Sequence, residues 1–346
     1  MYTHTQLKYQ FHSHPPFKAD KDWNMIVDHS SHSAVGMLPS ERFEPLRRLE
    51  VRGGWNNEGM ILMSDRLSGE LAVLKRAKVS SFEDRNEVEK LYRVKGHPNI
   101  SEILAHVPAS LDQVKGKEPS RISNRYEVYC HFEKMHLPIH DQIFMKYYVA
   151  KLGTVEVHTL AEILQHKGNR VPEGFAWAVL MGLLKALCFL HFGSVDVMCD
   201  QSDENWEPIL HRDLQMDNVF VHSGQVGYPD IVLGDFGSSK TEAQLRTHCP
   251  QLSAKEFEDW KALFPSDVKG LRDIMYIMLH DDNEWEGGGV LGSQTWRREW
   301  SDQLRDIVLP LNDLKNVDPR LLEYTRLVIR THAKLLESGI IRFERL

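Results

Sequence analysis

The sequence has few cysteines, and their positions exclude two common uses of the thiol. Only four occur in 346 residues, at Cys130, Cys188, Cys199 and Cys249, and no two of them form a C-x-x-C pair. A disulfide framework and a zinc ribbon both depend on closely spaced cysteines. The pattern therefore predicts a protein of a reducing compartment.

A block of basic residues and a secretory leader are also missing. The 42 lysines and arginines are outnumbered by 49 acidic residues, for a formal net charge of -7, and they form no sustained cluster. Binding to nucleic acid or to an anionic membrane uses such clusters. The first ten residues, MYTHTQLKYQ, lack a basic stretch followed by an apolar one. We expect an intracellular protein, cytoplasmic or nuclear, without a nucleic-acid partner.

One long apolar run is present, from Phe175 to Phe192. Its length and composition approach those of a membrane span, although Lys185 and His191 interrupt it. A buried helix at the centre of a large folded domain accounts for the same residues without a bilayer. We therefore expect a core helix and no membrane span.

The chain changes character along its length. Residues 1–40 are rich in His, Ser, Pro and Asp and have no apolar periodicity, which predicts a flexible N-terminal extension. Residues 41–152 contain short strand patterns broken by turns, with a helical pattern from Glu83 to Lys95. Residues 153–346 carry mainly helical periodicity. Four histidines of the extension match no metal-ligand spacing; they are His12, His14, His29 and His32.

Strands and helices can be placed within these two parts. Strand patterns occur around 49–52, 60–63, 71–75, 126–132 and 143–150. Helical patterns occur over 159–166, from Glu173 onward and over 268–279. The order is a small β-rich part followed by a larger helical part.

Two motifs near the middle of the chain are its most informative feature. The first is HRDLQMDNVFV, from His211 to Val221, and the second is LGDFG, from Leu233 to Gly237. Upstream, AVLK ends at Lys75 on a predicted strand, and a turn with several glycines precedes that strand. The motifs follow one another in a fixed order, so we interpret them as parts of one site.

This set resembles the protein kinase superfamily, Ser/Thr branch, from about Leu49 to near the C-terminus. The catalytic loop of that family reads H-R-D-x-x-x-x-N, and its D-F-G binds magnesium. The apolar helix that begins at Glu173 is also similar to those of fungal kinase-domain proteins. The resemblance implies an α+β, bilobal protein kinase fold. Its small β-rich N-lobe with one helix would span 41–152 and its larger, mainly helical C-lobe 153–346.

The resemblance implies a role in phosphoryl transfer for each motif residue. Asp213 is expected to accept or orient the proton of the substrate hydroxyl, while Asn218 and Asp235 are expected to bind Mg²⁺. Lys75 is expected to contact the phosphates of ATP and to pair with an acidic residue of the next helix. ATP and Mg²⁺ are thus the implied cofactors.

The acidic partner of Lys75 is predicted by helical register. With Glu87 in that role, the apolar residues Val88, Leu91 and Val94 face the core. Glu89 is the alternative. The interval between the lysine and Glu87 is shorter than the family usually shows.

The glycine-rich turn departs from the family pattern G-x-G-x-x-G. The aligned residues are Gly54, Asn56 and Gly59, with asparagine in place of the middle glycine. Glycine serves there because backbone amides approach phosphates closely at positive φ, which asparagine also tolerates. An ordinary hairpin turn accounts for the same residues. The kinase interpretation implies that they bind the nucleotide together with Ile61 and Val73 of the flanking strands.

Further positions bear on activity. Gln215 stands where a Ser/Thr kinase usually carries a lysine that reaches the γ-phosphate, and A-K-E, from Ala254 to Glu256, stands where A-P-E is usual. The segment S-D-V-K-G-L-R-D resembles the central helix of the kinase C-lobe, so Asp267 is expected to brace the catalytic loop. Hydroxyl residues between Gly237 and Ala254 are candidates for phosphorylation: Ser238, Ser239, Thr241, Thr247 and Ser253.

Three functions follow from the resemblance. The first is a protein serine/threonine kinase that transfers the γ-phosphate of ATP to a hydroxyl of a protein substrate. The alternative is a pseudokinase scaffold that binds nucleotide and a regulatory partner with little or no turnover, which Asn56, Gln215 and Lys255 favour. A small-molecule kinase, related to aminoglycoside or choline phosphotransferases, is disfavoured by the intact D-F-G and by the helix at Asp267.

Overall fold

The computed structural model describes most of the chain from Leu38 onward. Pro39–Leu346 form one compact unit, and Met1–Leu38 belong to a separate one. The described residues are 38–49, 57–78, 86–107, 140–152, 154–167, 171–199, 205–223, 228–248, 250–253, 255, 257, 267–279, 300–315 and 318–341. The predicted extension, the predicted strand over 126–132 and both Gly54 and Asn56 lie outside these residues. The fold is mixed α and β.

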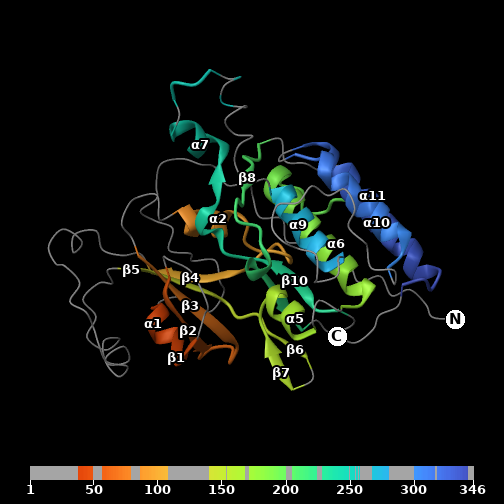
Figure 1. The fold of residues 1–346 in the computed structure, drawn as a ribbon. Helices are drawn as coiled ribbons and strands as arrows, with labels where there is room; N and C mark the ends of the chain where they lie inside the picture. Colours follow the sequence, from red (N-terminus) through yellow and green to blue (C-terminus); the bar gives the residue numbers. More distant parts are fainter. Residues whose placement is uncertain are drawn as a thin grey trace. The chain divides into compact units, whose positions relative to one another are not determined.

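A five-stranded antiparallel sheet is built from the first part of the unit (Figure 1). Its strand order is β1-β2-β3-β5-β4. The strands are β1 (Phe43–Leu49), β2 (Asn57–Asp65), β3 (Leu71–Lys78), β4 (Ile103–Val107) and β5 (His140–Lys146). A single helical turn, α1 (Pro39–Arg42), precedes β1, and α2 (Asn86–Arg93) connects β3 to β4. Helix α2 lies within the predicted range of Glu83 to Lys95.

Side chains alternate between the two faces of this sheet, as the strand period of two requires. On one face, Phe43 of β1 stacks on Phe144 of β5 at a centroid distance of 4.6 Å, and Met63 and Leu74 complete the cluster. On the other face, Val73 of β3 packs with neighbours from β2 and with Tyr147. Both faces are therefore covered by apolar contacts.

Three pairs of short strands and a set of helices follow. The pairs are β6 (Ala150–Leu152) with β7 (Val155–Val157), β8 (Ile209–Leu210) with β11 (Lys240–Thr241), and β9 (Val219–His222) with β10 (Asp230–Leu233). The helices are α5 (Leu160–Lys167), α6 (Glu173–Phe192), α7 (Glu242–His248), α9 (Asp267–Leu279), α10 (Asp302–Val308) and α11 (Arg320–Glu337). Three short 3₁₀ turns are η3 (Met216–Asn218), η4 (Phe236–Ser238) and η5 (Leu309–Asp313).

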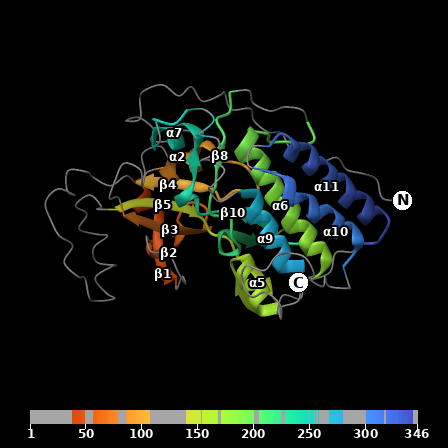
Figure 2. The ribbon, with the colours of Figure 1, turned by 45° about the horizontal axis from the view of Figure 1, so that its top comes forward.

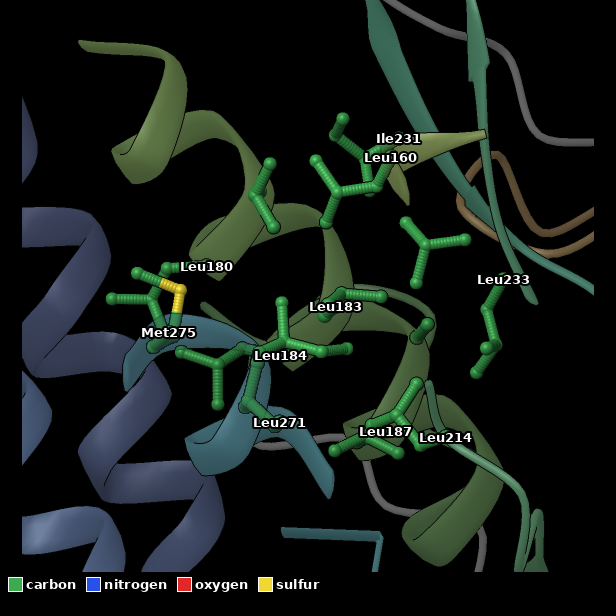
Figure 3. Close-up of a cluster of buried hydrophobic side chains, with 14 of the residues drawn as sticks. Leu160, Leu180, Leu183, Leu184, Leu187, Leu214, Ile231, Leu233, Leu271 and Met275 are labelled. Atoms are coloured by element: carbon green, nitrogen blue, oxygen red, sulfur yellow. The ribbon is translucent and has the colours of Figure 1, made fainter. Parts of the chain in front are cut away.

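Helices α9 and α11 pack against α6, as Figures 1 and 2 show. Helix α6 contacts α9, α11 and β10, and Leu183, Leu184 and Leu187 are each fully buried. Figure 3 shows Leu184 beside Leu271 and Met275 of α9, and Leu187 beside Leu214, within one buried cluster. Of the described residues, those of α6 alone form a helix long and apolar enough to cross a membrane, and 78% of its most apolar window is buried within the protein.

Helix α6 ends where its sequence provides a stop. Gly193 follows the last helical residue with φ 66°, and its amide donates to the carbonyl of Phe189. A left-handed residue at this position is the usual end of a helix, and glycine adopts it without steric cost. The chain then turns into the polar segment that leads to the HRD motif.

Candidate functional site

Lys75 is the centre of a buried group of charges at the edge between the sheet and the helices. It lies on β3, and only 6% of its side chain is exposed. Its Nζ donates to both carboxylate oxygens of Glu87 on α2, at 2.8 and 2.9 Å, and to Oδ1 of Asp235 at 2.9 Å. The predicted pairing with Glu87 is confirmed, whereas Glu89 accepts a hydrogen bond from Gln244.

The charges of this group determine one another's protonation. Burial acts to lower the pKa of Lys75, but the carboxylates of Glu87 and Asp235 outweigh it, and the pKa is raised above its usual value. Burial acts to raise the pKa of Asp235, but the charge and hydrogen bond of Lys75 outweigh it, and that pKa is lowered. Lys75 and Asp235 are thus held in their charged forms at neutral pH.

Two residues of the site have an unusual backbone. Arg212 has φ 67° and Asp235 has φ 58°, and they are the only non-glycine residues with positive φ in the part of the chain that the structure describes. This conformation is costly for residues with a Cβ atom, and it clusters at functional sites where the surroundings enforce it. At Asp235 it aims the carboxylate at Lys75 while a third of the side chain stays exposed.

The loop from His211 to Asn218 presents a second carboxylate. The side-chain amide of Asn218 donates to the carbonyl of Asp213 at 2.8 Å and to its Oδ2 at 3.0 Å. The second bond orients the Asp213 carboxylate, and the first fixes the backbone of the loop at that residue. Because the Asn218 nitrogen is used in this way, its carbonyl oxygen Oδ1 is the atom that can bind a cation.

Asp267, the first residue of α9, braces this loop from below as the sequence predicted. Its Oδ2 accepts the amide of His211 at 2.9 Å, and its Oδ1 accepts the amide of Arg212 at 2.7 Å. The ring of His191, from α6, lies 3.0 Å from the same carboxylate. Burial acts to raise the pKa of Asp267, but the hydrogen bond and charge of His191 outweigh it, so the pKa is lowered. The bracing carboxylate is ionised.

His211 links the two motifs. Its side chain is fully buried, and Nδ1 accepts the amide of Asp213 at 3.3 Å. Its Nε2 therefore carries the proton and donates to the carbonyl of Gly234 at 2.9 Å, directly before Asp235. The ring also meets Phe236 edge to face at 4.9 Å. The loop and the D-F-G segment are thus held together by one imidazole.

The apolar residues next to Lys75 differ in part from the predicted set. Val73 lies on the face of the sheet that carries Lys75, two residues away on β3. Ile61, which was grouped with it, instead packs on the opposite face with Phe43 and Leu74. The register of β2 and β3 shifts between Asn57 and Met60, so counting outward from the glycine-rich turn selects the wrong face.

Residues of β2 on the correct face were missed by sequence reasoning. Met60 lies opposite Lys75, and Leu62 lies opposite Val73. Counting alternate residues back from Lys75 across the strand pair would have identified both. Tyr147 joins them after β5, with a buried hydroxyl and a pKa raised by burial.

The remaining predicted positions are distributed as follows. Gly59 is part of β2, whereas Gly54 and Asn56 lie outside the described residues, as do Ala254 and Glu256. Gln215 is exposed and directly precedes η3. Two of the hydroxyl residues after the D-F-G motif are buried and hydrogen-bonded: Ser239 donates to the carbonyl of Phe236, and Thr241 accepts the amide of Gln244.

Within the described part of the chain, no group of three or more His, Cys, Asp or Glu residues is arranged to hold a metal ion. A scan against protein-family models found no matching family, and a search of curated proteins found no match. The site therefore has to be interpreted from its own geometry.

Proposed function

We propose that this chain is a protein serine/threonine kinase with the two-lobed fold of that superfamily, its N-lobe over 41–152 and its C-lobe over 153–346. One observation carries the proposal. Lys75 is hydrogen-bonded to both Glu87 and Asp235, beside a loop in which Asn218 orients Asp213. This is the set of side chains that phosphoryl transfer from ATP requires.

Each member of the set has a chemical task in this proposal. Lys75 holds oxygens of the ATP phosphates, and Glu87 keeps its ammonium group aimed at them. Asp213 accepts the proton of the substrate hydroxyl. A bond forms between that hydroxyl oxygen and the γ-phosphorus, the bond to the bridging oxygen breaks, and ADP leaves. Because the work is mostly positioning, the fixed geometry of Asp213 supports it.

Asp235 and Asn218 are the residues that would hold magnesium. A carboxylate and an amide carbonyl are oxygen ligands of the kind that Mg²⁺ prefers. Mg²⁺ commonly takes only one or two protein carboxylates, with phosphate oxygens and water completing the shell. Asp235 is ionised and partly exposed, and its αL backbone is enforced by its surroundings, so the two residues fit the ion. When bound, Mg-ATP supplies the phosphoryl group and cation charge.

The nucleotide base would lie against the apolar face beside Lys75. Val73, Met60 and Leu62 supply that face, and the turn containing Gly54, Asn56 and Gly59 would cover the phosphates. The partner would be a protein substrate, and the proposed setting is the cytoplasm or nucleus. No nucleic-acid contact is part of the proposal.

The decisive experiment is transfer of the γ-phosphate from Mg-ATP to a generic protein substrate by the purified chain and its Asp213→Asn variant. Loss of the proton acceptor should lower the rate by about 10²-fold or more. The matched control is Asp217→Asn, an identical change on the exposed side of the same loop, and it should keep the wild-type rate. Equal rates for wild type and Asp213→Asn would refute the assignment of the base.

A second function, a nucleotide-binding pseudokinase, is favoured by one position. Gln215 is exposed beside Asp213 and is neutral where a cation is usual. A missing cation near the transferring group costs transition-state stabilisation. The same experiment separates the two functions. No transfer by the wild type, together with a melting temperature that Mg-ATP raises, would support the pseudokinase.

A further inference from the structure

Helix α2, which carries Glu87, is tied at two points to segments far away in the sequence. Lys90 donates from Nζ to Oε1 of Gln244 on α7 at 2.6 Å. Arg93 donates to Oε2 of Glu207 at 3.2 Å and to its backbone carbonyl at 2.8 Å. We call these four residues, Lys90, Arg93, Glu207 and Gln244, the α2 clamp.

Glu207 belongs to the polar segment between α6 and the HRD motif, and it bonds to two elements at once. While Oε2 accepts from Arg93, its Oε1 accepts the backbone amide of Ala243 at the start of α7, at 3.3 Å. The preceding Trp206 donates to the carbonyl of Leu190 at 2.8 Å, and its ring lies 5.2 Å below the Arg93 guanidinium. Glu207 is thus anchored to the end of α6.

Gln244 is fixed in the same way on α7. Its Oε1 accepts the backbone amide of Thr241 at 3.0 Å in addition to the Lys90 ammonium, and its Nε2 donates to Glu89 at 3.5 Å. Lys90 is fully buried, and burial lowers its pKa to about 8. A buried amine without a partner is costly, so this contact resists being opened.

A helix as short as α2 has little stability of its own, so contacts decide where it lies. Its apolar side packs through Val88 and Leu91 into the main hydrophobic cluster. On its polar side, Glu87 accepts hydrogen bonds from Lys75, and Lys90 and Arg93 donate to the other two clamp residues.

We infer that Glu207 and Gln244 are positioning residues, which hold α2 where Glu87 accepts hydrogen bonds from Lys75. The effect on catalysis rests on the proposed kinase function, whereas the effect on α2 does not. The two parts can therefore be tested separately.

The structural part is tested by amide hydrogen exchange of Asn86–Arg93 in the Glu207→Gln variant. Weakening a charged hydrogen-bond acceptor should speed exchange in α2 about tenfold and leave α9 unchanged. Gln244→Met, which removes the other contact, should act in the same direction. The matched control is Glu242→Gln, an identical change on α7 whose ion-pair partner is Arg246 of the same helix. Unchanged exchange in α2 for both clamp variants would overturn the inference.

The catalytic part is tested by a double variant. Glu207→Gln alone should lower kcat/KM for ATP about tenfold. If it acts through Glu87, adding it to Glu87→Gln should cause no further loss, because neighbours that act as a unit are not additive. A full additional loss in the Glu87→Gln background would exclude positioning through Glu87. Absence of transfer by the wild type would refute the kinase proposal and leave the exchange result valid.

Discussion

At the scale of single residues, His97 has a protonation state that the fold controls. It is buried after α2, where its ring stacks on Phe189 of α6 at 4.7 Å and its Nδ1 accepts the amide of Asn99 at 3.2 Å. Burial, and then the positive charge of Lys185, lower the pKa of His97 from 6.5 to about 4. The folded protein keeps this imidazole neutral in mildly acidic solution.

This shift predicts a pH dependence of stability. Between pH 6.5 and 4 the unfolded chain binds a proton at His97 that the folded chain does not, so stability falls as the pH falls. By pH 4 this proton uptake lowers the free energy of unfolding by about 3 kcal/mol relative to pH 7. Urea unfolding at pH 7 and pH 4 measures this drop in stability. It should be absent in His97→Gln and present in His166→Gln, a control at an exposed position of α5. An equal loss of stability with pH in wild type and His97→Gln would contradict the assignment.

Residue patterns in the sequence predicted the charges of the site better than its apolar surface. Lys75, Glu87, Asp213 and Asp235 could be placed because fixed motifs and helical register specify them. Ile61 was misplaced because one register shift in β2 reverses the side of the sheet that a residue faces. The shift arises from strand pairing and leaves no mark in the local sequence.

At the scale of elements, α9 and the HRD loop approach closely at Gly270. A Cβ atom at this position would lie 2.5 Å from the carbonyl oxygen of Leu214 and 2.8 Å from its Cβ. Leu214 directly follows Asp213, and Asp267 of the same helix accepts two amides of the loop. Glycine therefore lets the helix support the loop at backbone distance.

Gly270→Ala should separate these two elements. The added methyl group should destabilise the protein by about 1–3 kcal/mol, although alanine by itself favours a helix. Displacement of Leu214 should also disturb Asp213, so phosphate transfer should fall more than stability alone explains. Lys269→Ala, on the exposed side of α9, is the control and should stay within about 0.5 kcal/mol of wild type. Urea unfolding and the transfer assay measure both; a fully stable and active Gly270→Ala would contradict the model of close support.

Long periodic elements were predictable, and short ones only in part. The helical patterns over 159–166, after Glu173 and over 268–279 correspond to α5, α6 and α9. Strand β4 was missed, because a register shift between Ile103 and Ala105 breaks the alternation that marks a strand. Arg320, at the start of α11, forms an ion pair with Asp318 at 2.6 Å, two residues before it.

At the scale of the whole molecule, one hydrophobic cluster crosses from the sheet region into the helices. It contains Leu91 of α2, Ile143 of β5, Leu183 of α6 and Val328 of α11, all nearly or fully buried. Residues that share one close-packed core lose their packing together when any part of that core unfolds. The proposed boundary between N-lobe and C-lobe at residue 152 remains a prediction, because this cluster contains residues from both sides of it.

Unfolding of the unit should consequently be a single transition. Tryptophan fluorescence, which reports on buried Trp177 of α6, and far-UV circular dichroism should give the same midpoint in urea. Leu91→Ala on α2 should shift both signals together by about 2–5 kcal/mol. The control Leu67→Ala, at an exposed turn position, should shift neither. Two separate midpoints, or a shift in one signal only, would show that the sheet and helices unfold independently.

The two partners of Lys75 also arrive at different times during synthesis. Glu87 lies 12 residues beyond the lysine and Asp235 lies 160 residues beyond it. A nascent chain can form the first ion pair locally, at a small cost in loop closure, while the second requires the HRD and D-F-G segments to have left the ribosome. Until then the lysine holds only half of its compensating charge. The ribosome must therefore synthesise most of the protein before this site can form. A chain released before Asp235 lacks the second ion pair of Lys75.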